Sequence, residues 1–246
     1  MERIPAGTFT MGCTDGAGEC FDHESPAHEV TLSRDFYIGR TEVTQGQYEE
    51  LMGTNPSSFS SCGAACPVEK VTWHMAADFA RELSVREGLE ECYACVDGGT
   101  LTSCEPLGDP YECGGYRLPT EAEWEFAARC GEDLLYAGSD DVGAVAWYSG
   151  NASTGPRVVA TKAPNACGLY DMSGNVEEWV GDNYGEDYYT YSPAVDPTGP
   201  STGSRRGERG GNWNADALYV RVADRRALPP EDRYNYVGFR LARTAL

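Results

Sequence analysis

Residues 165–179 read NACGLYDMSGNVEEW, a stretch that holds two glycines, two aromatic residues and three carboxylates. Gly168 and Gly174 allow backbone angles that other residues rarely adopt, so we expect a sharply bent backbone here. Carboxylates and free carbonyl groups close together on a tight turn are the oxygen ligands that calcium prefers. The spacing differs from that of an EF-hand loop. The residues alone therefore leave two interpretations, a calcium site and a solvated acidic turn.

The part that reads GLYDMSGNVEEW resembles the GLYDMxGNVWEW signature of the formylglycine-generating enzyme, or sulfatase-modifying factor, family. The resemblance continues in the family's order along almost the whole chain: IPAGTFTMG at 4–12, EVT at 42–44 followed by Tyr48, PV at 67–68 with VTW at 71–73, YRLPTEAEWE at 116–125, RGGNW at 209–213 and GFR at 238–240. It implies a compact, irregular α+β fold of the C-type-lectin-like kind, loop-rich and low in regular secondary structure. We expect one domain over residues 1–246, with a Cys-rich loop inserted at 89–115.

The formal net charge of −20 over 246 residues argues against binding to nucleic acid or to anionic membranes. No apolar run is long enough to span a membrane. The charge is uneven, because residues 205–246 hold nine arginines against five acidic residues. Ion pairing of these arginines with the acidic remainder of the chain is the interpretation that we favour.

Ten cysteines are many for a reduced cytosolic protein. They group along the chain as Cys13/Cys20, Cys62/Cys66, Cys92/Cys95/Cys104/Cys113 and Cys130/Cys167. The even number favours disulfides and an extracellular, periplasmic or cell-surface location. A zinc site in the group 92–113 is the alternative, although only one CxxC pair is present. We also expect a place in a larger or lipid-anchored surface protein, because a family motif follows directly on Met1.

Hydrophobic patterning predicts strands at 4–12, 29–33 and 36–38, and helices that begin after Thr44, near Trp73 and after Thr120. Thr120 and Glu123 have the spacing of a capping box. For the histidines we favour structural positions over metal ligation or chemistry: His23 and His28 in a surface loop, His74 in a hydrogen bond. The tyrosines at 184, 188, 189 and 191 indicate either a recognition loop or packing.

The resemblance implies calcium at the turn. The positions that match the family's ligands are Asp171, the carbonyls of Gly174 and Val176, and Glu178. Glu177 stands where the family usually has Trp, which adds a charge nearby. A second family site would use Asn151 and the Ala152 carbonyl, but its downstream Asp has no counterpart here, so we expect one calcium.

The family's oxidase chemistry is where this sequence departs most. Catalytic members use copper(I) held by two cysteines, two and seven residues after the Trp of RGGSW. Those positions here are Ala215 and Val220, and neither can supply the soft thiolate that copper(I) needs. We therefore expect no copper. Cys130 and Cys167 occupy positions where the family has other residues, which favours a bridge between them.

Two hypotheses follow. The first is a non-catalytic binding module for a protein or small-molecule ligand, with the C-terminal segment as its binding surface. By resemblance to diversified C-type-lectin-like variable proteins, the contact residues are Trp213, Asn214, Asp216, Leu218, Tyr219, Val220, Val222, Asp224, Tyr234, Asn235 and Tyr236. Many of these residue types are reachable from an Asn codon by changing adenines, which fits a diversified surface. The alternative is a formylglycine-generating-type oxidase, or another protein-modifying enzyme, of altered mechanism.

Overall fold

The computed structural model describes residues 1–14, 20–98, 102–152 and 154–246. The α-helices are α1 (Gln45–Met52), α2 (Trp73–Glu87), α3 (Glu121–Arg129) and α4 (Val142–Val145). The strands are β1 (Glu2–Ile4), β2 (Gly7–Met11), β3 (His28–Leu32), β4 (Phe36–Ile38), β5 (Tyr93–Asp97), β6 (Thr102–Pro106), β7 (Glu177–Asn183), β8 (Arg206–Arg209), β9 (Arg225–Leu228), β10 (Val237–Phe239) and β11 (Ala242–Thr244). Short helices and small sheets in a loop-rich chain confirm the predicted α+β class.

Four small sheets organise these strands. The largest has the order β10-β7-β8-β9, in which β10 pairs with β7 in parallel and the other two pairings are antiparallel. The sheet β1-β4-β11 brings both ends of the chain onto β4. The hairpins β2-β3 and β5-β6 complete the set. The signature turn therefore leads directly into β7, an inner strand of the largest sheet.

Helix starts follow the local signals in the sequence. The Thr44 hydroxyl accepts from the backbone N–H of Gln47, and the Gln47 side chain accepts from the Thr44 N–H, which makes a capping box. Thr120 and Glu123 form the predicted capping box at α3. Gly53 ends α1 in the left-handed conformation, with φ of 73°. The two N-caps satisfy N–H groups, and the Gly53 C-cap satisfies the Glu49 carbonyl, that the helix ends would otherwise leave without a partner.

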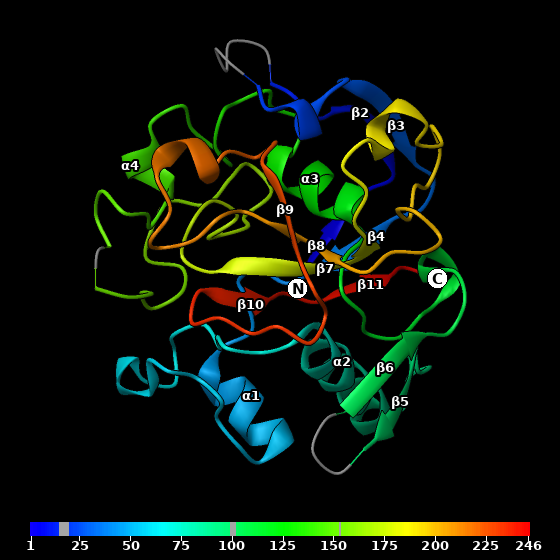
Figure 1. Cartoon of the computed structure of the whole chain (residues 1–246), viewed down its shortest axis with the longest axis vertical. Coiled ribbons are helices and arrows are strands. Elements are labelled where there is room, and N and C mark those ends of the chain that lie inside the picture. Colours follow the sequence, from blue (N-terminus) through cyan, green and yellow to red (C-terminus); the bar gives the residue numbers. More distant parts are fainter. Residues whose placement is uncertain (15–19, 99–101, 153) are drawn as a thin grey trace.

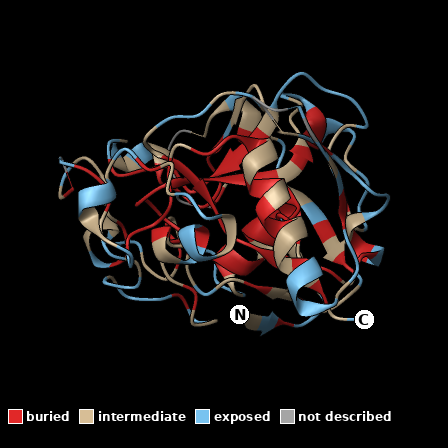
Figure 2. Cartoon of the chain, turned by 90° about the horizontal axis from the view of Figure 1, so that it is seen from below, coloured by how far each residue is buried: buried red, intermediate tan, exposed pale blue. Residues whose placement is uncertain are grey.

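Two hydrophobic clusters fill the interior on either side of the largest sheet. Figure 1 shows α3 above strands β7 and β10 and α2 below them, and Figure 2 shows the buried residues gathered inside. Trp179 belongs to the cluster of α2, whereas Val180 belongs to that of α3. The Trp73 indole N–H donates to the Val180 carbonyl at 2.9 Å, which ties α2 to the sheet. Neighbouring residues of β7 thus face opposite clusters, as the alternation of a strand requires.

All ten cysteines form disulfides: Cys13–Cys20, Cys62–Cys66, Cys92–Cys113, Cys95–Cys104 and Cys130–Cys167. The pairing within 92–113 rules out the zinc alternative for these thiols. The insertion expected as a loop is instead the hairpin β5-β6, closed by Cys95–Cys104 across the two strands. Five disulfides indicate an oxidising location outside the cytoplasm. Within the described residues, no helix has the length and apolar character needed to cross a membrane.

Candidate functional site

The segment from Asn212 to Asp224, here called the 212–224 loop, connects β8 to β9 and carries the short 3₁₀ helix η5 (Ala217–Tyr219). It is drawn in orange in Figure 1. Gly211, the residue before the loop, has φ of 64°, and a Cβ placed there would lie 2.1 Å from the Tyr219 carbonyl oxygen. Only glycine fits this approach. The glycine pair of the RGGNW motif therefore lets the loop fold back on itself.

The loop presents some of the predicted contact residues and buries others. Exposed side chains are those of Asn214, Asp216 and Leu218, together with Tyr234 from the segment before β10. Tyr219, Asn235 and Tyr236 are half-buried. The side chains of Trp213, Val220, Val222 and Asp224 are buried. The structure thus divides the predicted set into a surface group and a supporting group.

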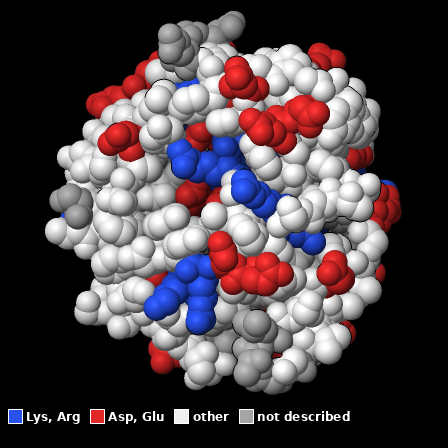
Figure 3. All heavy atoms as spheres, in the orientation of Figure 1, with Lys and Arg blue, Asp and Glu red and all other residues white. Residues whose placement is uncertain are grey.

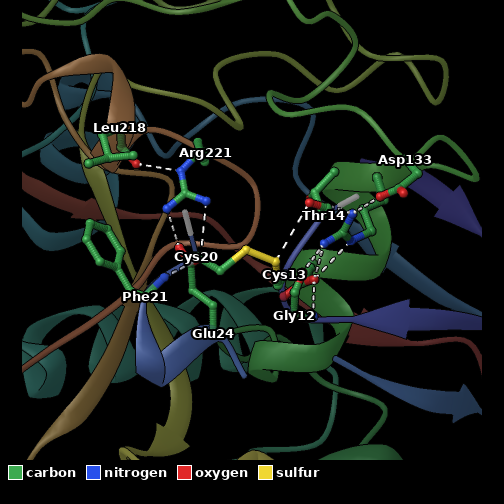
Figure 4. Close-up of a disulfide and its surroundings, with 11 residues drawn as sticks. Gly12, Cys13, Thr14, Cys20, Phe21, Glu24, Asp133, Leu218 and Arg221 are labelled. Atoms are coloured by element: carbon green, nitrogen blue, oxygen red, sulfur yellow. Dashed lines mark hydrogen bonds and ion pairs between the residues drawn. A yellow bond between two sulfur atoms is a disulfide. The ribbon is translucent and has the colours of Figure 1, made fainter. Parts of the chain in front are cut away.

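Buried arginines fix the backbone of the loop. The Arg221 guanidinium donates to both carboxylate oxygens of Glu24, at 2.7 and 3.1 Å, and to the Leu218 carbonyl at 2.9 Å. Figure 4 shows this contact beside the Cys13–Cys20 disulfide. Arg225 makes a similar pair with Glu121, at 2.6 and 2.8 Å. The interpretation that these arginines pair internally is therefore confirmed, and the pairs fix η5 through Leu218 and the end of the loop at Arg225.

A pocket of about 440 Å³ lies against the loop. Its floor comes from β7 and β8, through Glu177 and Glu208, and its walls from Asn212, Ala215, Tyr219, Arg226 and Tyr236. Figure 3 shows basic and acidic atoms side by side near the middle of one face of the molecule. The volume lies in the range of small-molecule sites. The predicted residues Asn214, Asp216, Tyr219 and Tyr236 all line this pocket.

Two buried carboxylates on the pocket floor lack full partners. Glu208 is 2% exposed and Glu177 is 3% exposed, and one oxygen of each has no hydrogen-bond partner in the described structure. Burial raises the pKa of Glu177 to about 7. Burial, and then the charge of Glu177, hold the pKa of Glu208 well above its ordinary value. The sequence signalled Glu177 only as a charge in place of Trp, and it gave no signal for Glu208.

Neither of the two positions that match the family's copper ligands has a thiol. Ala215 lines the pocket, whereas Val220 is fully buried in a small apolar cluster. Every cysteine of the chain is bound in a disulfide. The chain therefore offers no thiolate for copper(I) in this state.

In the signature turn, the left-handed backbone conformation occurs at two residues that are not glycines. Asp171 and Asn175 have φ of 57° and 61°, beside 77° for Gly168 and 81° for Gly174. One Asp171 oxygen accepts from the Ala160 N–H at 2.7 Å, and the other is buried without a partner. Burial raises the pKa of Asp171 to about 6. An unpartnered buried oxygen is compatible with a cation ligand.

Glu178, in contrast, is already neutralised. Its oxygens accept from Arg240 at 2.6 and 2.7 Å and from the Trp124 indole N–H at 2.8 Å. Among the described residues, the groups of three acidic, His or Cys side chains close enough to share a metal lie elsewhere. Of the two predicted carboxylate ligands, Glu178 is thus paired with Arg240, whereas Asp171 keeps one buried oxygen without a partner.

The remaining candidates have structural positions. The His74 ring accepts from the Cys104 N–H at 3.1 Å, which agrees with its predicted structural role. His23 lies 3.4 Å from Asp224 and, with Glu24, forms one of the groups that share a possible metal position. Glu24 of that group already forms an ion pair with Arg221, which favours a structural role for the group over metal binding. Among the tyrosines predicted to serve either recognition or packing, Tyr188 and Tyr189 are buried and Tyr191 is exposed, so the first two serve packing.

Comparisons with known proteins identify the family and the fold of the chain. The profile of the sulfatase-modifying factor enzyme 1-like domain matches residues 1–245. The formylglycine-generating enzyme of Streptomyces coelicolor is 30% identical over 289 residues, covering 99% of this chain and 88% of that enzyme. Chaperone protein LppX of Paenibacillus barcinonensis is 39% identical over 178 residues, covering 61% of this chain and 62% of that protein. Treponema denticola variable protein 1 has a similar solved structure, with a TM-score of 0.86 and 34% identity over 100% of this chain and 95% of that one.

Proposed function

The chain belongs to the sulfatase-modifying factor enzyme 1-like family, and from this premise we propose that it is a non-catalytic binding module. Its binding surface is the exposed part of the 212–224 loop together with Tyr234 and the adjoining pocket. The observation that carries the proposal is the pocket itself. Ala215, which matches one of the family's two copper-ligand positions, lines this pocket without a thiol, and Val220, which matches the other, is buried outside the lining.

The names of two relatives also support a binding function. One solved relative is named a variable protein and one curated relative is named a chaperone. On this basis we extend the proposal to a surface whose exposed residues are diversified among related proteins. The ligand is a protein or a small molecule. The alternative, an oxidase of altered mechanism, is tested by the same experiments.

We expect the variant Leu218→Arg/Tyr234→Ala to bind its ligand at least about tenfold more weakly than the wild type, a loss of about 1.4 kcal/mol. Leu218 and Tyr234 are 42% and 41% exposed, so their replacement removes contact surface without opening the core. The purified, disulfide-bonded protein is screened against a peptide display library and a glycan array. Titration calorimetry then gives the affinity of each binder for both forms.

The control is Val85→Arg, which changes an apolar side chain of similar exposure, 50%, on α2. It is expected to leave the affinity unchanged. An equal loss in both variants would contradict the proposed surface. Conversion of a cysteine-containing sulfatase peptide to an aldehyde, followed by mass spectrometry, would contradict the non-catalytic assignment and favour the oxidase.

Calcium at the signature turn is part of the proposal, with Asp171 and the carbonyls of Gly174 and Val176 as its ligands. We expect calcium at about one hundred times its Kd to add about 2.7 kcal/mol of stability and to raise Tm by several degrees. A chelator reverses the shift, and Asp171→Asn removes it. The control Asp187→Asn, at an exposed position, keeps it. A wild-type Tm that is the same with calcium and with chelator would rule out a stabilising site.

A further inference from the structure

The pocket beside the 212–224 loop has an unbalanced charge on its floor. Its charged lining residues are Glu177, Glu208, Asp216 and Arg226. Glu208 pairs with Trp179 across β7 and β8, and Glu177 lies two residues before Trp179, so both glutamates lie on the same face of the sheet. Two carboxylates from neighbouring strands therefore converge on one volume.

The single basic residue of the lining does not neutralise this pair. Arg226 donates to Asp224 at 3.2 Å and lies over the Tyr219 ring at 4.4 Å, while its Nε is 3.9 Å from the nearer Glu177 oxygen. Among the described residues, Glu208 makes no ion pair and no side-chain hydrogen bond. Asn212 donates to the other Glu177 oxygen at 3.1 Å. One buried oxygen on each glutamate thus has no hydrogen-bond partner among the described residues.

A buried carboxylate without a partner destabilises a fold, and proteins retain such groups where a ligand completes them. The group that matches two adjacent carboxylates is a cation with several N–H donors. Tyr219 and Tyr236 also line the pocket, and the Tyr219 ring already accommodates one cation, the Arg226 guanidinium, at 4.4 Å. The pocket is large enough for an ammonium or guanidinium group and its alkyl stem.

We propose that this pocket binds an organic cation, an ammonium or guanidinium group, against the carboxylates of Glu208 and Glu177. The inference rests on the proposed binding function and names the chemical class of the ligand. Such a group comes either from a free small molecule or from a lysine or arginine side chain of a polypeptide. The negative charge of the whole chain, −20, adds long-range attraction for either source.

The test uses titration of the whole protein with Nα-acetylarginine amide and Nα-acetyllysine amide at fixed ionic strength. Nα-acetylcitrulline amide and Nα-acetylnorleucine amide are the neutral counterparts of similar shape. We expect the cationic probes to bind at least about tenfold more tightly than the neutral ones, which corresponds to about 1.4 kcal/mol. The variants Glu208→Gln and Glu177→Gln are each expected to remove most of this preference.

The matched control is Glu231→Gln, an exposed carboxylate outside the pocket lining. It removes the same charge from the chain, so it separates local contact from long-range attraction. Glu208→Gln removes a buried charge without a counterion and is expected to keep or raise Tm at about pH 8. Circular dichroism and Tm thereby show that a loss of binding does not come from unfolding.

The source of the cation is distinguished by a pentapeptide with a central arginine between alanines. Tighter binding of the peptide than of the free amide supports a polypeptide source, and equal binding supports a small molecule. Equal affinity for cationic and neutral probes, the same loss in Glu231→Gln, or displacement of the probes by calcium at lower concentration would each overturn the inference. If the variant at Leu218 and Tyr234 loses its ligand while Glu208→Gln binds that ligand normally, the cation site fails and the proposed function stands.

Discussion

The variant Arg240→Met is expected to lose about 3–5 kcal/mol of unfolding free energy, because it leaves the buried charge of Glu178 without its partner. Arg240 is fully buried and donates to Glu178, to the Gly39 carbonyl at 2.9 Å and to the Tyr170 carbonyl at 3.0 Å. It therefore joins β10 to β7, to the residue after β4 and to the signature turn. Chemical denaturation followed by tryptophan fluorescence measures the loss.

Neighbouring acids increase the expected effect. Burial holds the pKa of Glu42 well above its ordinary value, and the charges of Asp171 and Glu178 raise it further, while Arg240 lowers it. Removing Arg240 leaves three buried carboxylates together. When folding raises the pKa of a carboxyl, the folded state becomes less stable as the pH rises above the pKa of that carboxyl in the unfolded chain, about 4. The loss of unfolding free energy in Arg240→Met is therefore expected to be smaller at about pH 5 than at about pH 8.

Two further variants complete the test. Arg240→Met/Glu178→Gln removes both charges and keeps an acceptor for the Trp124 indole, so we expect it to recover about 2–3 kcal/mol relative to the sum of the single losses. Arg3→Met breaks the surface pair with Asp35, in which the Arg3 side chain is 63% exposed, and should cost less than about 1 kcal/mol. Equal losses for Arg3→Met and Arg240→Met would contradict the proposed importance of the buried pair.

Removal of the Cys130–Cys167 disulfide is expected to have the second large effect. The bond closes a segment of 37 residues, and the loop-entropy relation gives a loss of about 4 kcal/mol for the variant Cys130→Ala/Cys167→Ala. It also fixes the end of α3 to the residue before the signature turn, because Cys130 is the C-cap of that helix. Thermal unfolding under non-reducing conditions measures the change.

The Cys62–Cys66 disulfide is the matched comparison, because it closes only 4 residues and should contribute about 2 kcal/mol. Adding a reductant to the wild type should reproduce the loss of the first variant or exceed it. If both double variants lose the same stability, the chain-entropy account of the longer bridge is wrong.

Local chemistry made parts of the fold predictable. Thr44 and Thr120 mark the starts of their helices in the sequence, because a capping box involves residues only three positions apart. The internal pairing of Arg221, Arg225 and Arg240 was also predictable, because an acidic chain with a basic end can neutralise itself. The identity of each partner, such as Glu24 for Arg221, depends on tertiary contacts that no local pattern contains.

Other features lay beyond the sequence for physical reasons. The β5-β6 hairpin was missed because its cysteines and glycines are typical of a loop, while the cross-strand bridge supplies the order. Asp171 and Asn175 adopt left-handed angles that were expected only of glycine. The pocket needs Glu177 and Glu208 from different strands of one sheet, and only the strand register brings them to the same face.

The division of the 212–224 loop into exposed and buried side chains has a consequence for evolution. Asn214, Asp216 and Leu218 point outward, while the backbone beneath them is held by ion pairs of Arg221 and Arg225 with distant segments. Surface substitutions away from special features usually change stability by less than about 0.5 kcal/mol. Under the proposed function, selection can therefore change ligand recognition at these exposed positions with little loss of stability, because other residues hold the backbone in place.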